Sequence, residues 1–268
     1  MDAASLSLNS ATLPSLGVAD LVDVAVGNSL GGIGLWRHVY ADIGVHQASR
    51  MITSAGLAVT SVCRAGMFPT ASDVNARATR DDNVRAVDEA HALGAECLVV
   101  VCGAAATPDL NAARRHVEDG LSDLARYAAT AGVSLAVEPM HPMMIADRSV
   151  VTSLSEAVDL VERTADPRVG VALDAYHVFW DVDYPREAMR ASGRIHTVQI
   201  SDWTVPIHHQ LRSRGMPGEG VIDLRGFMAI VRAAGFRGLV EVEVLSDRWA
   251  AVPPQVAVDA MVQGVATL

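Results

Sequence analysis

The sequence predicts a single (β/α)8 TIM barrel, and three observations support this fold class. Short apolar runs of strand length alternate with stretches of helical periodicity along the 268 residues. Eight such runs are present, which is the number of parallel strands that closes this kind of barrel. Glycines stand just beyond several helical stretches, as expected where a helix ends and the chain turns into a strand. No linker or internal repeat divides the chain, so we expect one domain covering residues 1–268.

The expected strands are rich in valine, leucine and small residues, as strands buried on both faces are. They cover residues 5–9, 32–36, 58–63, 97–103, 134–139, 169–174, 195–202 and 239–245. The expected helices cover residues 17–27, 42–55, 81–94, 109–131, 153–165, 184–192, 223–234 and 254–266. A doubly wound open sheet is the competing fold. The GGIG cluster at 31–34 disfavours it, because the glycines precede a strand, whereas a dinucleotide-binding fingerprint follows one.

Composition narrows the classes of function. The formal charge of −10 would repel a nucleic-acid backbone, so nucleic acid is not an expected partner. No apolar run approaches the ~20 residues of a membrane helix, and residues 1–15 lack the basic and apolar regions of a secretory signal. Cys63, Cys97 and Cys102 form no C-x-x-C pair, which indicates reduced thiols. We expect a cytoplasmic protein without membrane contact, and a homo-oligomer is left open.

Polar side chains stand where several of the predicted strands end. Glu138, Asp174, Gln199 and Glu243 lie at or near the carboxyl ends of four consecutive strands, where the catalytic groups of such barrels are found. Residues two apart share a strand face, so the first three should point into the barrel beside small residues. Converging carboxylates repel one another unless a cation lies between them, and oxygen donors favour Mn²⁺ or Mg²⁺. We therefore interpret Asp174 as a metal ligand. For each acid the alternative is a helix cap or an arginine pair.

Five segments together resemble a known family. They are LAVEP, LDAYH, VQISD, RGMPGEGVID and a final G-x-x-x-x-E from Gly238 to Glu243. The chain is similar to the xylose isomerase-like sugar isomerases and epimerases, whose fold is also described as that of AP endonuclease family 2. The resemblance implies one divalent metal, Mn²⁺ first and Mg²⁺, Co²⁺ or Zn²⁺ as alternatives, held by Glu138, Asp174, Gln199 and Glu243. Many members carry histidine where Gln199 stands, and hydroxypyruvate isomerase-like members carry glutamine.

The resemblance also implies substrate contacts. His177 matches a histidine that contacts a substrate oxygen, although it could instead be a helix-packing histidine. Arg214 matches an arginine that reaches a substrate hydroxyl or carbonyl, and its alternative is a solvated loop charge.

Two segments depart from the family pattern. The strand at 32–36 runs into GLWRH where many relatives carry an acid, so Trp36, or its neighbours Arg37 and His38, is expected to line a different substrate subsite. The lengthened loop TVPIHHQLRS offers His209, and beside it His208, as a substrate contact or a solvated side chain.

Glu241 shares a strand face with Glu243 and should lie one layer deeper in the barrel. It either supports a metal ligand or is a buried structural acid held by hydrogen bonds.

The activity implied by the resemblance is isomerisation or epimerisation of a small sugar or polyol-derived substrate. Glu138 and Glu243 would move a proton through a cis-enediolate while the metal polarises the carbonyl. A lyase or dehydratase using the same site, and a non-catalytic sugar-binding barrel, are the alternatives. DNA-repair endonucleases of this fold need zinc-binding histidines on several strands, and the segments SVCRAG and VVVCGA contain none.

Overall fold

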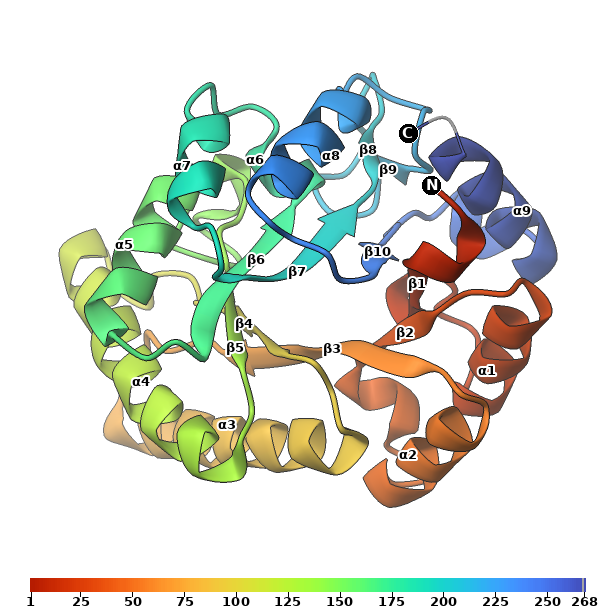
Figure 1. Cartoon of the computed structure of the whole chain (residues 1–268). Helices are drawn as coiled ribbons and strands as arrows, with labels where there is room; N and C mark the ends of the chain where they lie inside the picture. The colour runs from red at the N-terminus through yellow and green to blue at the C-terminus, as the bar shows by residue number, and fades with distance from the viewer. Residues whose placement is uncertain (267) are drawn as a thin grey trace.

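Eight parallel strands close into a barrel, which confirms the predicted fold class (Figure 1). The computed structural model describes residues 1–266 and 268. Around the barrel the order is β1, β10, β7, β6, β5, β4, β3, β2, so an open doubly wound sheet is excluded. The barrel strands are β1 (Leu6–Asn9), β2 (Gly32–Trp36), β3 (Ala58–Gly66), β4 (Leu98–Val101), β5 (Leu135–Glu138), β6 (Val169–Asp174), β7 (Ile195–Ile200) and β10 (Val240–Val242). After β7, the short strands β8 (Asp202–Trp203) and β9 (Arg214–Gly215) pair antiparallel at the barrel mouth.

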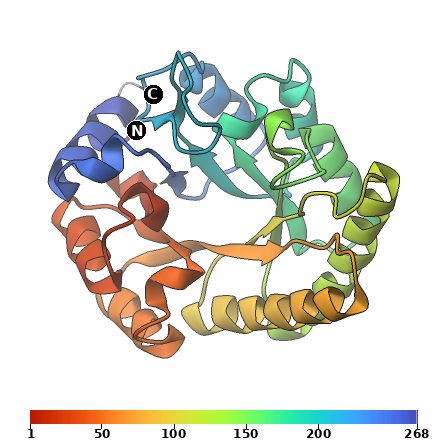
Figure 2. The same cartoon turned by 180° about the vertical axis from the view of Figure 1, so that it is seen from behind.

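Helices surround the strands, as both views show (Figures 1 and 2). They are α1 (Val18–Gly27), α2 (Val45–Ser54), α3 (Asp73–Leu93), α4 (Leu110–Ala131), α5 (Leu154–Thr164), α6 (Ala175–Val178), α7 (Tyr184–Arg190), α8 (Leu224–Ala233) and α9 (Pro254–Val265). Short 3-10 helices are η1 (Ala3–Ser5), η2 (Ser10–Thr12), η3 (Arg37–Tyr40), η4 (Pro142–Met144) and η5 (Trp249–Ala251). Every helix expected from the sequence is present.

Two helical features differ from the expectation. Helix α3 begins at Asp73, well before residue 81, because Ser72 caps it by accepting a hydrogen bond from the Asn75 N–H. Its first turns are solvated, with Val74 78% exposed, so they carry no apolar periodicity. Helix α6 is a single turn, too short to show a period.

The buried apolar residues form two layers. Inside the barrel, Val99, Val101, Ala136 and Ala172 form a small cluster with Cys97, Met140 and Met144. The alternate residues of the same strands, such as Leu135, Val137 and Leu173, belong to the larger core between strands and helices. The predicted strand parity is therefore confirmed, with small residues on the face that carries Glu138 and Asp174.

The three cysteines are free and buried, as predicted. The chain ends meet, since the Met1 amino group donates to the Val265 carbonyl at 3.2 Å. Among the described residues, no helix has both the length and the apolarity needed to cross a membrane.

Three glycines in different surroundings allow the packing to be tested by stability measurements. Gly132, just past α4, has φ +71° and open space around it, so Gly132→Ala should lower the free energy of unfolding by about 1 kcal/mol through backbone strain alone. Gly170→Ala should lower the free energy of unfolding by more than Gly132→Ala does, because a Cβ at residue 170 would lie 2.2 Å from the Arg194 carbonyl oxygen. Gly27, in α1, has open space and no positive φ, so Gly27→Ala is the matched control and should be neutral or stabilising. Urea unfolding measures all three. Equal losses at residues 27 and 170 would contradict the packing described.

Candidate active site

Four of the predicted residues meet at one mouth of the barrel, where the strands have their carboxyl ends. Glu138 ends β5, Asp174 ends β6, Gln199 lies near the end of β7, and Glu243 follows β10. A small cavity of about 30 Å³ is lined there by Trp36, Glu138, Gln199, Arg214 and Glu243, together with Arg64, Arg148, Leu211 and further side chains. A larger space of about 410 Å³ lies outside the barrel between α3 and α4, away from the strand ends. We place the candidate site at the mouth because the convergent carboxylates are there.

Glu138 is the least neutralised of these acids. Its side chain is 4% exposed, and its carboxylate forms no hydrogen bond or ion pair with the described part of the chain. Burial, reinforced by repulsion from Glu243 and Asp174, raises its pKa well above the usual value for a glutamate. A buried carboxylate without a donor is the kind of group that binds a cation or accepts a proton.

Glu243 is held on both oxygens. The Trp36 indole N–H donates to Oε1 at 3.0 Å, and Arg214 Nη1 lies 3.3 Å from Oε2. Burial raises its pKa to about 7, although the Arg214 charge acts in the opposite direction. Trp36 therefore contacts a candidate catalytic acid, whereas its neighbour Arg37 pairs with Asp82 and Glu89 of α3, away from this mouth.

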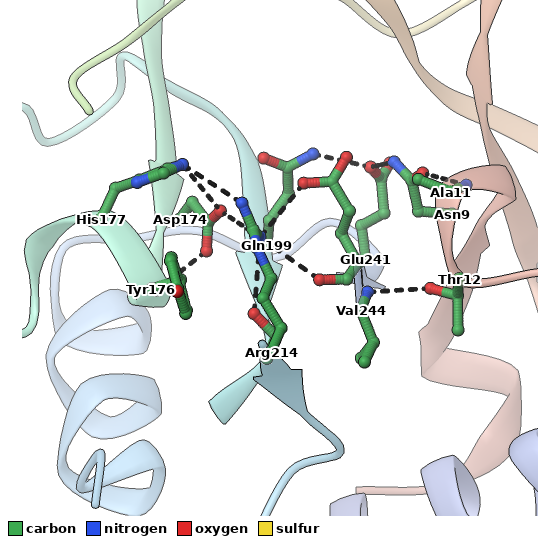
Figure 3. A network of polar contacts seen from close by, with 12 residues as sticks. Asn9, Ala11, Thr12, Asp174, Tyr176, His177, Gln199, Arg214, Glu241 and Val244 are labelled. Carbon is green, nitrogen blue, oxygen red and sulfur yellow. Dashed lines mark hydrogen bonds and ion pairs between the residues drawn. The ribbon is translucent and has the colours of Figure 1, made fainter. Parts of the chain in front are cut away.

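Asp174 combines a helix cap with an arginine pair, the two alternatives that its sequence position left open. Its Oδ1 accepts from the Tyr176 N–H at 2.9 Å and caps α6, and its Oδ2 accepts from Arg214 Nη1 at 2.8 Å (Figure 3). Burial raises the pKa of Asp174, with Arg214 opposing the shift. Arg214 itself is 2% exposed and lies 4.4 Å from the centre of the Tyr176 ring, so it is not a solvated loop charge.

His177 lies beside this pair. One ligand atom each of Glu138, Asp174 and His177 lie within 4.8 Å of one another, which would suit a metal ion. However, both ring nitrogens face donors, since Nδ1 accepts from the backbone N–H of His141 at 3.1 Å and Nε2 lies 3.2 Å from Arg214 Nη2. Burial, with Arg214, lowers the pKa of His177 well below its usual value, so the ring is neutral and has one acceptor nitrogen.

The backbone donor is fixed in place, while the arginine side chain can move. If Nδ1 of His177 keeps its acceptor role toward the His141 N–H, the neutral ring carries its proton on Nε2. A protonated Nε2 cannot ligate a metal but can donate to a substrate oxygen. This tautomer would suit the predicted substrate contact of His177, which the expected ligand set does not include.

Gln199 supplies the strongest sign that a cation fits here. Its Nε2 donates to Glu241 Oε1 at 2.8 Å, while its Oε1 is buried and has no hydrogen-bond partner among the described residues. A buried carbonyl oxygen without a donor is rare and calls for a missing partner. A hard divalent ion bound by Glu138, Asp174, Gln199 and Glu243 would supply that partner and offset the repulsion between the carboxylates.

His209 is placed differently from the residues above. It lies in the loop between β8 and β9, where its Nδ1 accepts from the N–H groups of Leu211 and Arg212 at 3.0 and 3.2 Å and so shapes the loop. The described residues that line the small cavity do not include it. A substrate contact of His209 stays a prediction, and the adjacent His208 is exposed.

An aromatic group lies beside the site, and no sequence motif indicates it. Trp203 packs against Tyr176, His141 and Phe179, with ring centres 4.7, 4.9 and 5.2 Å apart. These residues come from three separate loops and short elements, so no local spacing could have grouped them. The sequence signal is only that Tyr176 lies within the LDAYH segment and Phe179 follows it by two residues.

Comparisons with known proteins agree with this fold. The family model described as "Xylose isomerase-like TIM barrel" matches residues 16–263. The crystal structure of protein SMc04130 from Sinorhizobium meliloti 1021 is 41% identical, covers 98% of each chain and superposes with a TM-score of 0.95.

Two curated relatives are enzymes. A 3-dehydroshikimate dehydratase of Pseudomonas aeruginosa is 32% identical over 170 residues, which is 61% of this chain and 26% of that protein. An L-ribulose-5-phosphate 3-epimerase, UlaE, of Shigella boydii is 28% identical over 140 residues, which is 51% of this chain and 45% of that protein. The chain thus matches less than half the length of either. The family match covers nearly the whole barrel, and the chain belongs to the xylose isomerase-like TIM barrel family.

Proposed function

We propose that this protein is a divalent-metal-dependent isomerase or epimerase of a small sugar-like hydroxy-carbonyl compound. The observation that carries the proposal is the pair of buried glutamates, Glu138 and Glu243, on one cavity at the barrel mouth, with Glu138 lacking any donor among the described residues. A base and an acid beside a carbonyl are what proton transfer at the neighbouring carbon requires.

The proposed metal ligands are Glu138, Asp174, Gln199 and Glu243, with Mn²⁺ as the first choice of ion. When bound, the ion would polarise the substrate carbonyl and so make the adjacent C–H more acidic. The unpartnered Oε1 of Gln199 and the raised pKa of Glu138 support this assignment.

The proton transfer itself belongs to the two glutamates. Either Glu138 or Glu243 removes the proton beside the carbonyl, and the other, or the same one, returns it. The Trp36 indole keeps Glu243 oriented through its 3.0 Å hydrogen bond. His177 Nε2–H and the Arg214 guanidinium are the donors placed to bind substrate oxygens, and the aromatic group around Trp203 keeps that side of the site dry.

A dehydratase is the second candidate. Arg64 and Arg148 line the cavity together with Arg214, and a guanidinium there would suit a substrate that carries an anionic group. The relative named 3-dehydroshikimate dehydratase supports the same alternative. Both reactions begin with removal of a proton beside a carbonyl. The small-molecule substrate, the cytoplasmic location and the absence of a nucleic-acid partner stay predictions.

We expect the purified protein to bind one divalent ion per chain after incubation with Mn²⁺, as measured by elemental analysis. Asp174→Asn keeps an oxygen to cap α6 but removes a charge, and it should weaken binding by about 10-fold or more. Glu118→Gln, on the exposed outer face of α4, is the control and should bind normally. A wild-type chain that stays free of Mn²⁺, Mg²⁺, Co²⁺ and Zn²⁺ would rule out the proposed site.

Glu138→Gln and Glu243→Gln each keep an oxygen for the metal but remove the base. Each should lower turnover by about 10²-fold or more while metal content falls much less. In D₂O the wild-type enzyme should place deuterium at the carbon beside the carbonyl, and both variants should do so slowly. Near-normal turnover in both variants, or product without solvent deuterium, would contradict the two-glutamate shuttle.

Product mass separates the two reactions. We expect a panel of ketoses and polyol-derived ketones, 3-dehydroshikimate included, to give isomers of unchanged mass. A product lighter by one water from any of them would favour the dehydratase. If no compound is converted but one of them raises the Tm, the chain is a sugar-binding barrel.

A further inference from the structure

Glu241, one layer below the mouth, is surrounded by donors. It is fully buried on β10 and accepts hydrogen bonds from side chains of three other strands. Figure 3 shows its contacts with Asn9 and Gln199. Asn9 Nδ2 and Gln199 Nε2 donate to its Oε1 at 2.6 and 2.8 Å. The hydroxyls of Thr60 and Ser61 donate to its Oε2 at 2.7 and 2.8 Å. The proposed proton transfer by Glu138 and Glu243 does not involve this carboxylate.

The barrel is shaped to admit this side chain. A Cβ at Gly34 on β2 would lie 2.3 Å from Glu241 Oε2, so only glycine fits opposite the carboxylate. The last glycine of the GGIG cluster therefore makes room for Glu241.

The two amide donors have only one workable orientation. Asn9 Oδ1 accepts from the Ala11 N–H at 2.8 Å, so the Asn9 amide must turn its Nδ2 toward Glu241. A carboxylate offers acceptors only, so Gln199 must likewise present Nε2 to it. The oxygen of a planar amide then points the other way. Gln199 lines the cavity shared by Glu138 and Glu243, and its Oε1 is one of three buried side-chain atoms without a hydrogen-bond partner among the described residues.

We propose that Glu241 is a positioning residue that locks the Gln199 amide so that its Oε1, and not its NH₂ group, is presented to the divalent ion. The inference rests on the proposed metal site. With the amide reversed, two N–H bonds would face the cation and a ligand would be lost. Glu241 thus acts on the ion through Gln199, not by its own charge or contact.

A double-mutant cycle tests this with Mn²⁺ affinity measured by calorimetry. Glu241→Met fills similar space without an acceptor, and it should weaken Mn²⁺ binding by about 10-fold or more. In a Gln199→Ala background the same substitution should cost less than about 3-fold, because the amide it orients is gone. Equal losses in the two backgrounds would overturn the proposal.

Glu241→Gln is the matched control for charge. It can keep its oxygen toward the two amides and turn its NH₂ toward the hydroxyls of Thr60 and Ser61, which rotate to accept. Mn²⁺ affinity should then fall by less than about 3-fold. A loss as large as that of Glu241→Met would show that Glu241 acts by charge, and would also overturn the proposal.

A second readout needs neither metal nor a variant at position 241. In the metal-free protein the Gln199 side-chain NH₂ signals, identified by their absence in Gln199→Ala, should exchange slowly with water. Exchange at the rate of an exposed amide would refute the lock even if Glu241→Met fails to fold. A wild-type protein with a slowly exchanging amide but no Mn²⁺ binding would instead refute the proposed metal site, and with it the purpose of the lock.

Discussion

One constraint governs the candidate site: the buried carboxylates of Glu138, Asp174 and Glu243 at the barrel mouth, and of Glu241 one layer below, have a single buried guanidinium beside them. Glu138, Asp174, Glu241 and Glu243 are each at most 4% exposed, and Arg214 is the one arginine buried with them in the described chain. Burying charge without partners is strongly unfavourable, so each acid needs compensation. Glu241 has four side-chain donors, Asp174 has a backbone N–H and Arg214, and Glu243 has Trp36 and Arg214. Glu138 has no hydrogen-bond donor or ion pair among the described residues, and the cation we propose would compensate its charge.

Arg214 currently holds the centre of this arrangement. It bonds to Asp174 at 2.8 Å and lies 3.3 Å from Glu243 and 3.2 Å from His177 Nε2, while its own Nε has no partner in the described part of the chain. A divalent ion shared by the same carboxylates would take over their neutralisation. Arg214 and the Nε2–H of His177 would then both be available to a substrate oxygen. Because the ion would replace Arg214 as the partner of the carboxylates, metal binding would favour substrate binding.

Much of the fold and of the candidate site can be predicted from the sequence, because alternate residues along a strand point to the same face. Alternation placed Glu138 and Asp174 inward beside Ala136 and Ala172, and the eight barrel strands follow from apolar runs bounded by turns. The predicted burial of Glu241 also holds, but its role does not follow from sequence alone, because its donors Asn9 and Thr60 lie on strands far away in the chain. The tautomer of His177 likewise depends on a backbone N–H from another loop. The first turns of α3 cannot be predicted in this way, because a solvated helix end has no periodic repeat of apolar residues.

The proposed metal site is tested most directly by a crystal structure of the protein with Mn²⁺, in which anomalous scattering locates the ion. We predict one anomalous peak at the barrel mouth, in contact with Glu138, Asp174, Glu243 and the Oε1 of Gln199, and we expect Arg214 to have moved away from Asp174. An ion coordinated by His177 Nε2 would contradict this prediction. So would an ion fully bound elsewhere in the molecule while the Arg214–Asp174 pair stays intact.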